Sequence, residues 1–430
     1  MNWSMGRLPL VLSCLSLTPA LLPAQQTLQL DQAIQTALLH NPSMTSAEAS
    51  ASAAAASRWA DWGAFLPTVT ANGSVSKTDF STITFLNPDG TTTVLDEALD
   101  DTNKNNSAGL NFGLRLSADQ FANLGAGSAR QDAADFRLAA TSSEVVRQVK
   151  VAYFDALKRQ ALVGVAERQT EARSQDYEVT RGRYQIAAAT RSDLLGAEID
   201  LRNAELRILD ARDAFVSAVR QLRASLGQDV SGILPGDLIL EELEGIPDAF
   251  DLEADRLVAS AFANNPGLRA LAADERAASA SVLSARASYL PTLNFGLNLG
   301  RGRQVADDES LFSFSPANTN RNVSISASWA LFSGFQRKQR NAETSSQLTQ
   351  VRASITAQEF QIEREVRDLV DGLRRRAHRL QLMESNTELS SERLDLARES
   401  YRRGSITYFN LQQAIESLDQ SQQDVLDERY

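Results

Sequence analysis

Residues 348–383 read LTQVRASITAQEFQIEREVRDLVDGLRRRAHRLQLM, with no proline and a single glycine, Gly372. Apolar residues recur here at intervals of three, four and seven, at Leu348, Val351, Ile355, Ile362, Val366, Leu369, Leu373, Leu380 and Met383. This spacing predicts a helix with a narrow apolar seam, as in a coiled coil. The proline-free stretch runs from Lys338 to Arg403, so at 1.5 Å per residue the helix would be roughly 100 Å long. A helix of that length has to project from a compact domain.

A second long helix is predicted earlier in the chain, from about Ser128 to Arg183. Both long helices end at a short break, residues 183–190 and residues 401–408, and both are followed by a predicted return helix. The return helices are Asp193–Leu226 and Asn410–Tyr430. The sequence therefore predicts two long helical hairpins.

The residues of the two breaks differ in how well they suit a turn. Gly404 favours the left-handed geometry that ends a helix, whereas Ala187 at the matching position suits it less well. Ser192 and Asp193 are predicted to cap the first return helix. Asn410 plays that part less clearly in the second hairpin.

The two hairpins belong to a larger internal repeat. At one constant offset, Asn41-Pro42 recurs as Asn265-Pro266 and Leu66-Pro67-Thr68 recurs as Leu290-Pro291-Thr292. At a second constant offset, Tyr184, Thr190, Leu194 and Ala197 recur as Tyr401, Thr407, Leu411 and Ala414. Two constant offsets indicate a duplicated unit.

The offsets also define the boundaries of the repeat. We expect a first repeat at residues 25–227, a linker at 228–251 and a second repeat at 252–430. The last helix of the second repeat is shorter than its counterpart, and we expect that it is truncated.

Each repeat contains a pair of strand-like segments after its Leu-Pro. In the first repeat, Val69, Ala71, Gly73 and Val75 alternate with polar residues, and the second repeat has the same pattern at Val323, Ile325, Ala327 and Trp329. Such alternation predicts strands with one apolar face, and ten-residue strands fit a membrane barrel. A sheet in a soluble domain remains an alternative. The acidic connections 86–106 and 301–321 are predicted to be solvent-facing loops.

The N-terminus has the features of a secretory signal peptide, residues 1–24. Arg7 precedes the apolar stretch Leu8–Leu22, and small residues follow at Pro23-Ala24. The chain's one cysteine, Cys14, lies inside this segment, which leaves a lipoprotein signal as an alternative. An export signal places the mature chain outside the cytoplasm.

Composition and motifs exclude several functional classes. A net charge of -11 argues against nucleic acid as a partner, because binding phosphates needs a basic face. The two histidines, His40 and His378, have no partners at the spacing of a metal site or a catalytic triad. Gly125-Ala126-Gly127 does not extend to a dinucleotide-binding motif. We therefore expect no enzymatic activity, no cofactor and no metal site.

Taken together, these motifs resemble the TolC-like outer membrane efflux protein family. The resemblance covers nearly all of the mature chain and rests on the order of weak motifs: Leu28-Gln29-Leu30-Asp31-Gln32-Ala33, the Asn-Pro and Leu-Pro pairs, Ala330-Leu331-Phe332-Ser333-Gly334-Phe335, the Tyr/Arg-rich turns and the repeat.

The resemblance implies a fold that is mainly α with membrane β. Each chain of a homotrimer would give four strands to a 12-stranded outer-membrane barrel, and the hairpins would form a tunnel through the periplasm. Its tip would meet a periplasmic adaptor protein and, through it, an inner-membrane transporter. The implied function is a passive duct for efflux or type I secretion. A soluble periplasmic coiled-coil adaptor or scaffold remains the alternative. Neither the cargo nor the cognate pump follows from the sequence.

The resemblance also implies candidate site residues. Those expected to contact the adaptor lie at the hairpin tips: Arg183, Tyr184, Ile186, Ala187, Ala188, Ser192, Arg403, Gly404, Ser405, Ile406 and Thr407. Asp193, Glu198 and Asp200 are candidates for a tunnel gate. The alternative for the tip residues is that they only form turns, and for the acidic residues that they belong to a solvated helix face.

Overall fold

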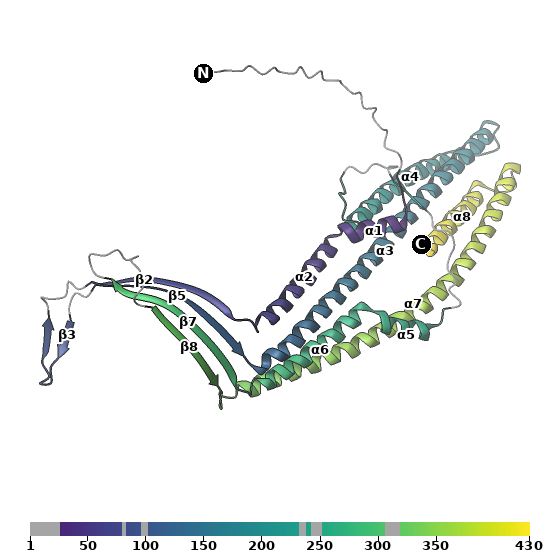
Figure 1. Ribbon diagram of the computed structural model, residues 1–430. Helices are drawn as coiled ribbons and strands as arrows, with labels where there is room; N and C mark the ends of the chain where they lie inside the picture. Colours follow the sequence, from purple (N-terminus) through teal and green to yellow (C-terminus); the bar gives the residue numbers. More distant parts are fainter. Residues whose placement is uncertain (1–25, 80–82, 96–101, 232–237, 242–251, 306–318) are drawn as a thin grey trace, which may run out of the picture. The chain divides into compact units, whose positions relative to one another are not determined.

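The computed structural model describes residues 26–79, 83–95, 102–231, 238–241, 252–305 and 319–430 (Figure 1). The predicted signal peptide with Cys14, the centres of both predicted acidic loops and most of the predicted linker lie outside the described residues.

The same order of elements occurs twice in the described chain: two consecutive helices, strands of one sheet, a long helix and a return helix (Figure 1). The first set is α1 (Leu30–His40), α2 (Pro42–Gly63), β2 (Thr68–Asp79), β5 (Thr102–Leu116), α3 (Ala118–Gln185) and α4 (Arg191–Ser225). The second set is α5 (Ala254–Asn264), α6 (Pro266–Ala287), β7 (Thr292–Val305), β8 (Thr319–Ser328), α7 (Gln336–Arg403) and α8 (Tyr408–Arg429).

The chain forms two compact units. Among the described residues, the turn unit comprises 26–41, 145–231, 238–241 and 375–430, so it contains both turns that join a long helix to its return helix. The sheet unit comprises Pro42–Glu144 and Asp248–Arg374 and contains the four long strands. The long helices α3 and α7 contribute residues to both.

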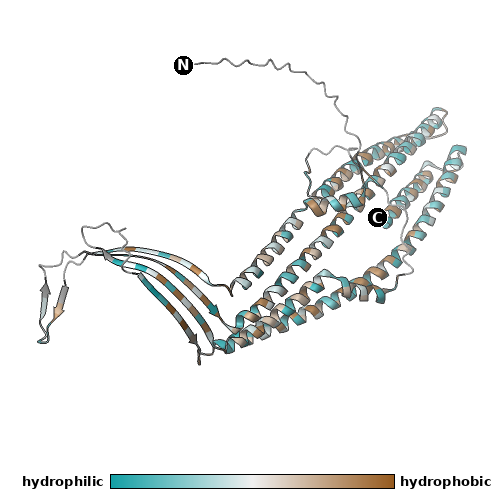
Figure 2. Ribbon diagram, viewed as in Figure 1, coloured by the Kyte–Doolittle hydropathy of each residue, from teal (hydrophilic) through white to brown (hydrophobic). Residues whose placement is uncertain are grey.

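The sheet unit is built on a four-stranded antiparallel sheet with the order β2-β5-β7-β8. Apolar positions face each other across it, for example Leu114 opposite Phe295 and Leu297 opposite Val323. Figure 2 shows apolar and polar residues alternating along these strands. The side-chain period of two in a strand therefore gathers the apolar residues on one face. We call this the apolar face and the other the polar face.

Asparagines join three strands on the polar face. Asn111 donates from its amide to Oδ1 of Asn72 at 2.8 Å, and the amide of Asn298 donates to Oδ1 of Asn111. Within the described part of the sheet, β2 pairs only with β5, and β8 pairs only with β7. The sheet thus has two unpaired edges of 12 and 10 residues.

Helix α2 begins directly at Pro42, because proline is well suited to the first helical position. Two boundaries differ from the predictions. Helix α3 begins at Ala118, ahead of the predicted start near Ser128. The predicted loop after Leu86 contains part of a small hairpin, β3 (Ile83–Leu86) and β4 (Thr92–Leu95), with a turn at Gly90.

The long helices have 68 residues each, which corresponds to about 100 Å at 1.5 Å per residue. The predicted seam of α7 is partly wrong. Leu369 and Leu373 are 60% and 49% exposed, whereas the neighbouring Val370 is 3% exposed. A straight helix drifts by about 20° per heptad against a 3.5-residue repeat, so the buried stripe leaves the predicted positions. Among the described helices, none is long and apolar enough to cross a membrane.

The turn unit is anchored by Tyr153 of α3, whose side chain is fully buried. Its hydroxyl lies 2.9 Å from the carbonyl oxygen of Leu28 and 2.8 Å from that of Glu241. These two residues lie at the ends of a short parallel pair, β1 (Gln26–Leu28) and β6 (Leu238–Leu240). Tyr153 thereby fixes segments from before and after the first hairpin against the same helix.

Candidate functional site: the paired helix turns

The first turn joins α3 to α4. The N–H of Ala188 donates to the carbonyl of Arg183 at 2.8 Å, and the N–H of Ala187 donates to that of Tyr184 at 3.0 Å. These two bonds form a Schellman motif, which satisfies carbonyls that the helix end leaves unpaired. The motif needs a left-handed residue, and Ala187 takes that place with a φ of +59°. The alanine therefore adopts the geometry for which the sequence indicated it was poorly suited.

The second turn joins α7 to α8 and repeats the same pattern. The N–H of Ser405 donates to the carbonyl of Ser400 at 2.9 Å, and that of Gly404 donates to Tyr401 at 3.0 Å. Gly404 is the left-handed residue, with a φ of +80°. The two turns thus have one backbone design, although the left-handed residue is glycine in only one of them.

The return helices are capped by threonines, which corrects the predicted caps. Thr190 and Asp193 form a capping box: the Thr190 hydroxyl accepts from the Asp193 N–H at 3.1 Å, and the Asp193 carboxylate accepts from the Thr190 N–H at 2.9 Å. In the second turn, Thr407 accepts from the Asn410 N–H at 3.4 Å. The residue that caps a helix start has an extended backbone, whereas the residues after it are helical. Thr190 and Thr407 have this extended backbone. The second turn has glycine but a simpler cap.

Arg183 links the two turns. Its Nη2 donates to the carbonyl of Ala188 at 2.9 Å, and its guanidinium lies 4.4 Å from the ring centre of Tyr401. A cation over an aromatic face is attracted by the ring's electrons. Nε and Nη1 of Arg183 are buried without a hydrogen-bond partner among the described residues. The ring of Tyr401 therefore takes the place of a hydrogen-bond acceptor for this guanidinium.

The other predicted tip residues fall into two groups. Tyr184, Ile186, Ala187, Ala188, Ser192, Arg403, Gly404 and Ser405 are exposed, and Ile186 is exposed to 76%. Arg403 makes an ion pair with Glu399 of its own helix at 2.6 Å. Ile406 instead packs against a core cluster that includes Tyr401, Tyr408 and Leu411. The first turn thus exposes the apolar side chains of Ile186, Ala187 and Ala188.

The three gate candidates have different surroundings. Asp193 belongs to the capping box described above. Asp200 accepts a hydrogen bond of 2.8 Å from the hydroxyl of Tyr408, which joins α4 of the first hairpin to α8 of the second. Glu198 is partly buried on α4 between them in sequence. Only Asp200 of the three makes a hydrogen bond between the hairpins in the described structure.

A cluster of buried charges lies between the same helices, and the sequence analysis missed it. Arg173 of α3 donates to the carboxylate of Asp419 on α8, and Arg207 of α4 lies 3.6 Å from that carboxylate. Asp176 of α3 accepts from Nη2 and Nε of Arg398 on α7, at 3.1 and 3.2 Å. The side chains of Arg173 and Asp419 are only 8% and 13% exposed. Four helices are thus cross-linked by charge pairs.

Burial shifts the proton affinity of two groups in this region. It raises the pKa of the Asp419 carboxyl, and the charges of Arg173 and Arg207 only partly oppose that rise. Burial, together with the hydrogen bond to Asp200, also raises the pKa of the Tyr408 hydroxyl well above its ordinary value.

A pattern in the sequence could have revealed the cluster. On α3, Arg173, Asp176, Thr180 and Arg183 follow one another at spacings of three, four and three, which places them on one helix face. Asp419 likewise continues the spacing of Tyr408, Leu411 and Ile415 on α8. Charged residues in the phase of an apolar seam therefore mark positions that face another helix. Their partners could not be identified in this way, because they lie on distant helices of the other hairpin.

This arrangement consists of turns, helix caps, ion pairs and an exposed apolar tip. It is therefore suited to recognising and binding another molecule. Among the described residues, no group of three or more histidines, cysteines or acidic side chains is placed to hold a metal ion.

Comparison with known proteins assigns the chain to a family. The family model described as "Outer membrane efflux protein" matches residues 33–228 and 257–430. Protein CyaE of Bordetella pertussis is 28% identical over 244 residues, which is 55% of this chain and 49% of that protein. The alkaline protease secretion protein AprF of Pseudomonas aeruginosa is 25% identical over 218 residues, 50% of this chain and 44% of that protein. The chain's matches thus span about half the length of these curated relatives.

The fold is also similar to solved structures. The outer membrane protein VceC from Vibrio cholerae matches with a TM-score of 0.75 and 18% sequence identity, over 93% of this chain and 92% of that one.

Proposed function

Because the chain belongs to the outer membrane efflux protein family, we propose that it is one subunit of a homotrimeric outer-membrane channel. The channel would be a passive duct of an efflux or type I secretion system, and its helices would extend into the periplasm. The observation that carries this proposal is the open four-stranded sheet, which has one apolar face and two long edges that are unpaired among the described residues. We further propose that residues 25–227 and 252–430 are two copies of a duplicated unit.

The edges of the sheet support assembly into a barrel. An unpaired strand edge exposes a row of backbone donors and acceptors, which is intolerable in lipid. Three copies of the chain would remove every edge if β8 of one subunit paired with β2 of the next, giving 12 strands. The strands have 10 to 15 residues, and a membrane-spanning strand needs about 9–11.

The apolar face supports contact with lipid. Val323 and Ile325 of β8 are 73% and 72% exposed in the single chain. Where β8 ends, Trp329, Phe332 and Phe335 are also largely exposed. Aromatic side chains gather where a membrane meets water, so these residues fit the boundary on the side of the helices.

For the paired turns, we propose contact with a periplasmic adaptor protein and, through it, with an inner-membrane transporter. The proposal includes all eleven tip residues, with the exposed Ile186 as the centre of the contact. The name of the relative AprF, a secretion protein, supports a transport role. Asp193, Glu198 and Asp200 are proposed to form the gate, in which the Tyr408–Asp200 hydrogen bond would hold the hairpins together.

Cell fractionation followed by gel electrophoresis of unheated and boiled samples tests the channel. We expect the protein in the outer-membrane fraction, in a band near three times the monomer mass that collapses on boiling. Ile325→Lys should abolish this band, because a lysine facing the middle of a bilayer costs about 2–4 kcal/mol. The matched control is Ser324→Lys, which changes the neighbouring residue on the polar face. A monomeric protein in the soluble periplasm would overturn the proposal and favour an adaptor or scaffold.

Photo-crosslinking tests the adaptor contact. A crosslinking amino acid at position 186 should capture a periplasmic coiled-coil adaptor in expressing cells. The control position is Leu209, which is also apolar and 57% exposed but lies in the middle of α4. Equal capture from both positions would show that the turn has no special role.

A further inference from the structure

One end of the apolar face is basic. Lys77 of β2, Lys104 of β5, Arg301 and Arg303 of β7 and Arg321 of β8 lie near the far ends of the alternating apolar series on their strands. On the same face the strands finish at Asp79, Thr102, Val305 and Thr319. The register places Lys77 opposite Lys104, Arg301 opposite Ala108, and Arg321 opposite Leu299. All four strands therefore contribute a cation at the end of the face that is remote from α6 and α7. We call these five residues the basic rim.

The polar face has a different composition. On its described positions, the strands carry mainly asparagine, serine, threonine and glycine, with Arg115 as the one cation. The basic rim is thus a property of the apolar face and does not reflect a generally basic sheet. The chain as a whole has a net charge of -11, whereas the five cations of the rim stand against one acidic residue, Asp79, among the described strand positions of this face.

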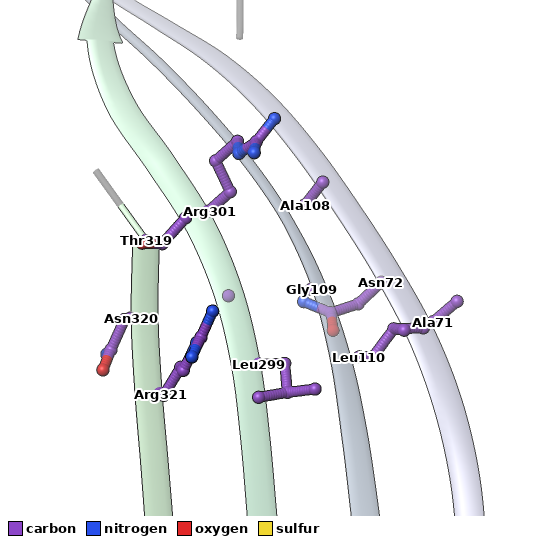
Figure 3. A pocket seen from close by; sticks show the side chains of 11 residues that line it. Ala71, Asn72, Ala108, Gly109, Leu110, Leu299, Arg301, Thr319, Asn320 and Arg321 are labelled. Atoms are coloured by element: carbon purple, nitrogen blue, oxygen red, sulfur yellow. The ribbon is translucent and has the colours of Figure 1, made fainter. Parts of the chain in front are cut away.

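The rim borders a hollow of about 890 Å³ in the sheet surface. Ala71, Leu110 and Leu299 supply apolar lining, and Arg301 and Arg321 supply charge (Figure 3). In Figure 3 the Arg321 side chain extends from β8 toward β7 near Leu299. Both arginines are exposed, and neither has a hydrogen bond or ion pair within the described structure. Two guanidinium groups therefore lie beside an apolar surface with their donors available.

We infer that the basic rim binds the phosphate groups of an anionic lipid, whose acyl chains lie along the apolar face below. This inference rests on the proposed placement of the sheet in a membrane. Arginine binds phosphate through two parallel N–H···O bonds, and long cationic side chains reach from an apolar surface to the lipid headgroups. Leu299 and Arg301 are two positions apart on one face, which corresponds to about 7 Å along a strand. One amphiphile spans that distance.

The two ends of the apolar face support a lipid over a soluble anion. The end near the helices carries Trp329, Phe332 and Phe335, whereas the other end carries the basic rim. A site for a soluble phosphate ester would need only the cations. Here the cations continue an exposed apolar series, which matches a ligand with a charged head and apolar chains.

A lipid titration tests the inference. Detergent-purified protein is titrated with a fluorescent diphosphoryl lipid A, and binding is followed by fluorescence anisotropy. The double variant Arg301→Gln, Arg321→Gln should bind about 10-fold more weakly or worse, because hydrogen bonds to charged groups are lost. Arg115→Gln is the matched control on the polar face and should bind like the wild type. A double variant with lysine at both positions should retain most of the affinity, since the charge is kept.

The outcomes separate the inference from the proposed channel. Equal binding by the glutamine and wild-type proteins, or equal binding of the dephosphorylated lipid, would overturn the basic rim as a lipid site. Displacement of the lipid by millimolar inorganic phosphate would assign the rim to a soluble anion and overturn it too. The heat-sensitive band of the wild type on gels is measured in parallel. If this band is absent, the proposed channel is overturned. If the band is present but the lipid binds equally well without the arginines of the rim, only the lipid site is overturned. If the double variant does not assemble, lipid binding by the single variant Arg321→Gln is compared with that of the wild type.

Discussion

Ala187 and Gly404 occupy the same position in the two Schellman turns, one in each hairpin, and both have left-handed φ angles, +59° and +80°. The hydrogen bonds of the two turns match pair for pair. The backbone design is therefore the same in both hairpins, while the cost of the left-handed residue differs, because a side-chain Cβ crowds the following carbonyl in that geometry.

Exchanging these residues should change stability in opposite directions. Ala187→Gly should raise the free energy of unfolding by about 1 kcal/mol, and Gly404→Ala should lower it by about the same amount. A Cβ on Gly404 would meet only Arg183 Nη2 at 3.5 Å, so backbone strain is the main cause. Thermal melting of the helical circular dichroism signal measures both. Ala188→Gly, at a position without a left-handed φ, is the control and should not stabilise the protein.

Replacing Asp193 should separate its role as a cap from its proposed role in a gate. Asp193→Ala should lower the free energy of unfolding by about 1 kcal/mol, because the capping box loses one of its two bonds. Glu198→Ala should change the free energy of unfolding by no more than about 0.5 kcal/mol, because Glu198 is only partly buried and lies outside the capping box. Denaturant melts measure the stability, and single-channel conductance in planar bilayers measures gating. A wild-type melt for Asp193→Ala would contradict the cap.

Breaking the Asp419–Arg173 ion pair should lower the free energy of unfolding strongly, whereas replacing the whole pair with apolar residues should not. Asp419→Asn should destabilise the turn unit by about 3–5 kcal/mol, because Arg173 is left buried without a counter-charge. Replacing Arg173, Arg207 and Asp419 together by leucine should be close to neutral or stabilising. Denaturant melts of the two variants provide the comparison. A triple variant less stable than Asp419→Asn would show that the charges themselves hold the hairpins together.

Alkaline pH should weaken the turn unit through Tyr408. The pKa of Tyr408 is raised in the folded chain by burial and by Asp200, so folding favours the protonated hydroxyl. This stabilisation is complete below the ordinary tyrosine pKa of about 10 and is lost above it, at about 1.4 kcal/mol per pH unit, until the raised folded pKa is reached.

Melts between neutral pH and pH 11 test this linkage. Tyr408→Phe should be less stable than the wild type at neutral pH but should lose less stability as the pH rises above 10. The control is Tyr184→Phe, since Tyr184 is 38% exposed at the first turn. An identical pH dependence for wild type and Tyr408→Phe would contradict a role for the buried hydroxyl.

The sequence predicted the locations of both turns but not how they are capped. Gly404 and the repeated Tyr-x-x-x-x-x-Thr spacing place the turns, because helix ends depend on local geometry. Thr190 and Thr407 were missed as caps in favour of Ser192, Asp193 and Asn410. Several polar residues near the start of a helix can serve as its cap, and the extended backbone that selects one of them is visible only in the structure.

Local patterns in the sequence determined the type and order of the elements. Period-two alternation, proline after asparagine or leucine, and long proline-free stretches depend on neighbouring residues, so the strands and helices could be predicted without knowing what they contact. The tertiary structure decided which side chains meet. Arg173 and Asp419 are 246 residues apart, and Arg321 lies opposite Leu299 only because of the register of β7 and β8. Such pairs depend on how distant elements pack, and packing is set by the free energy of the whole chain.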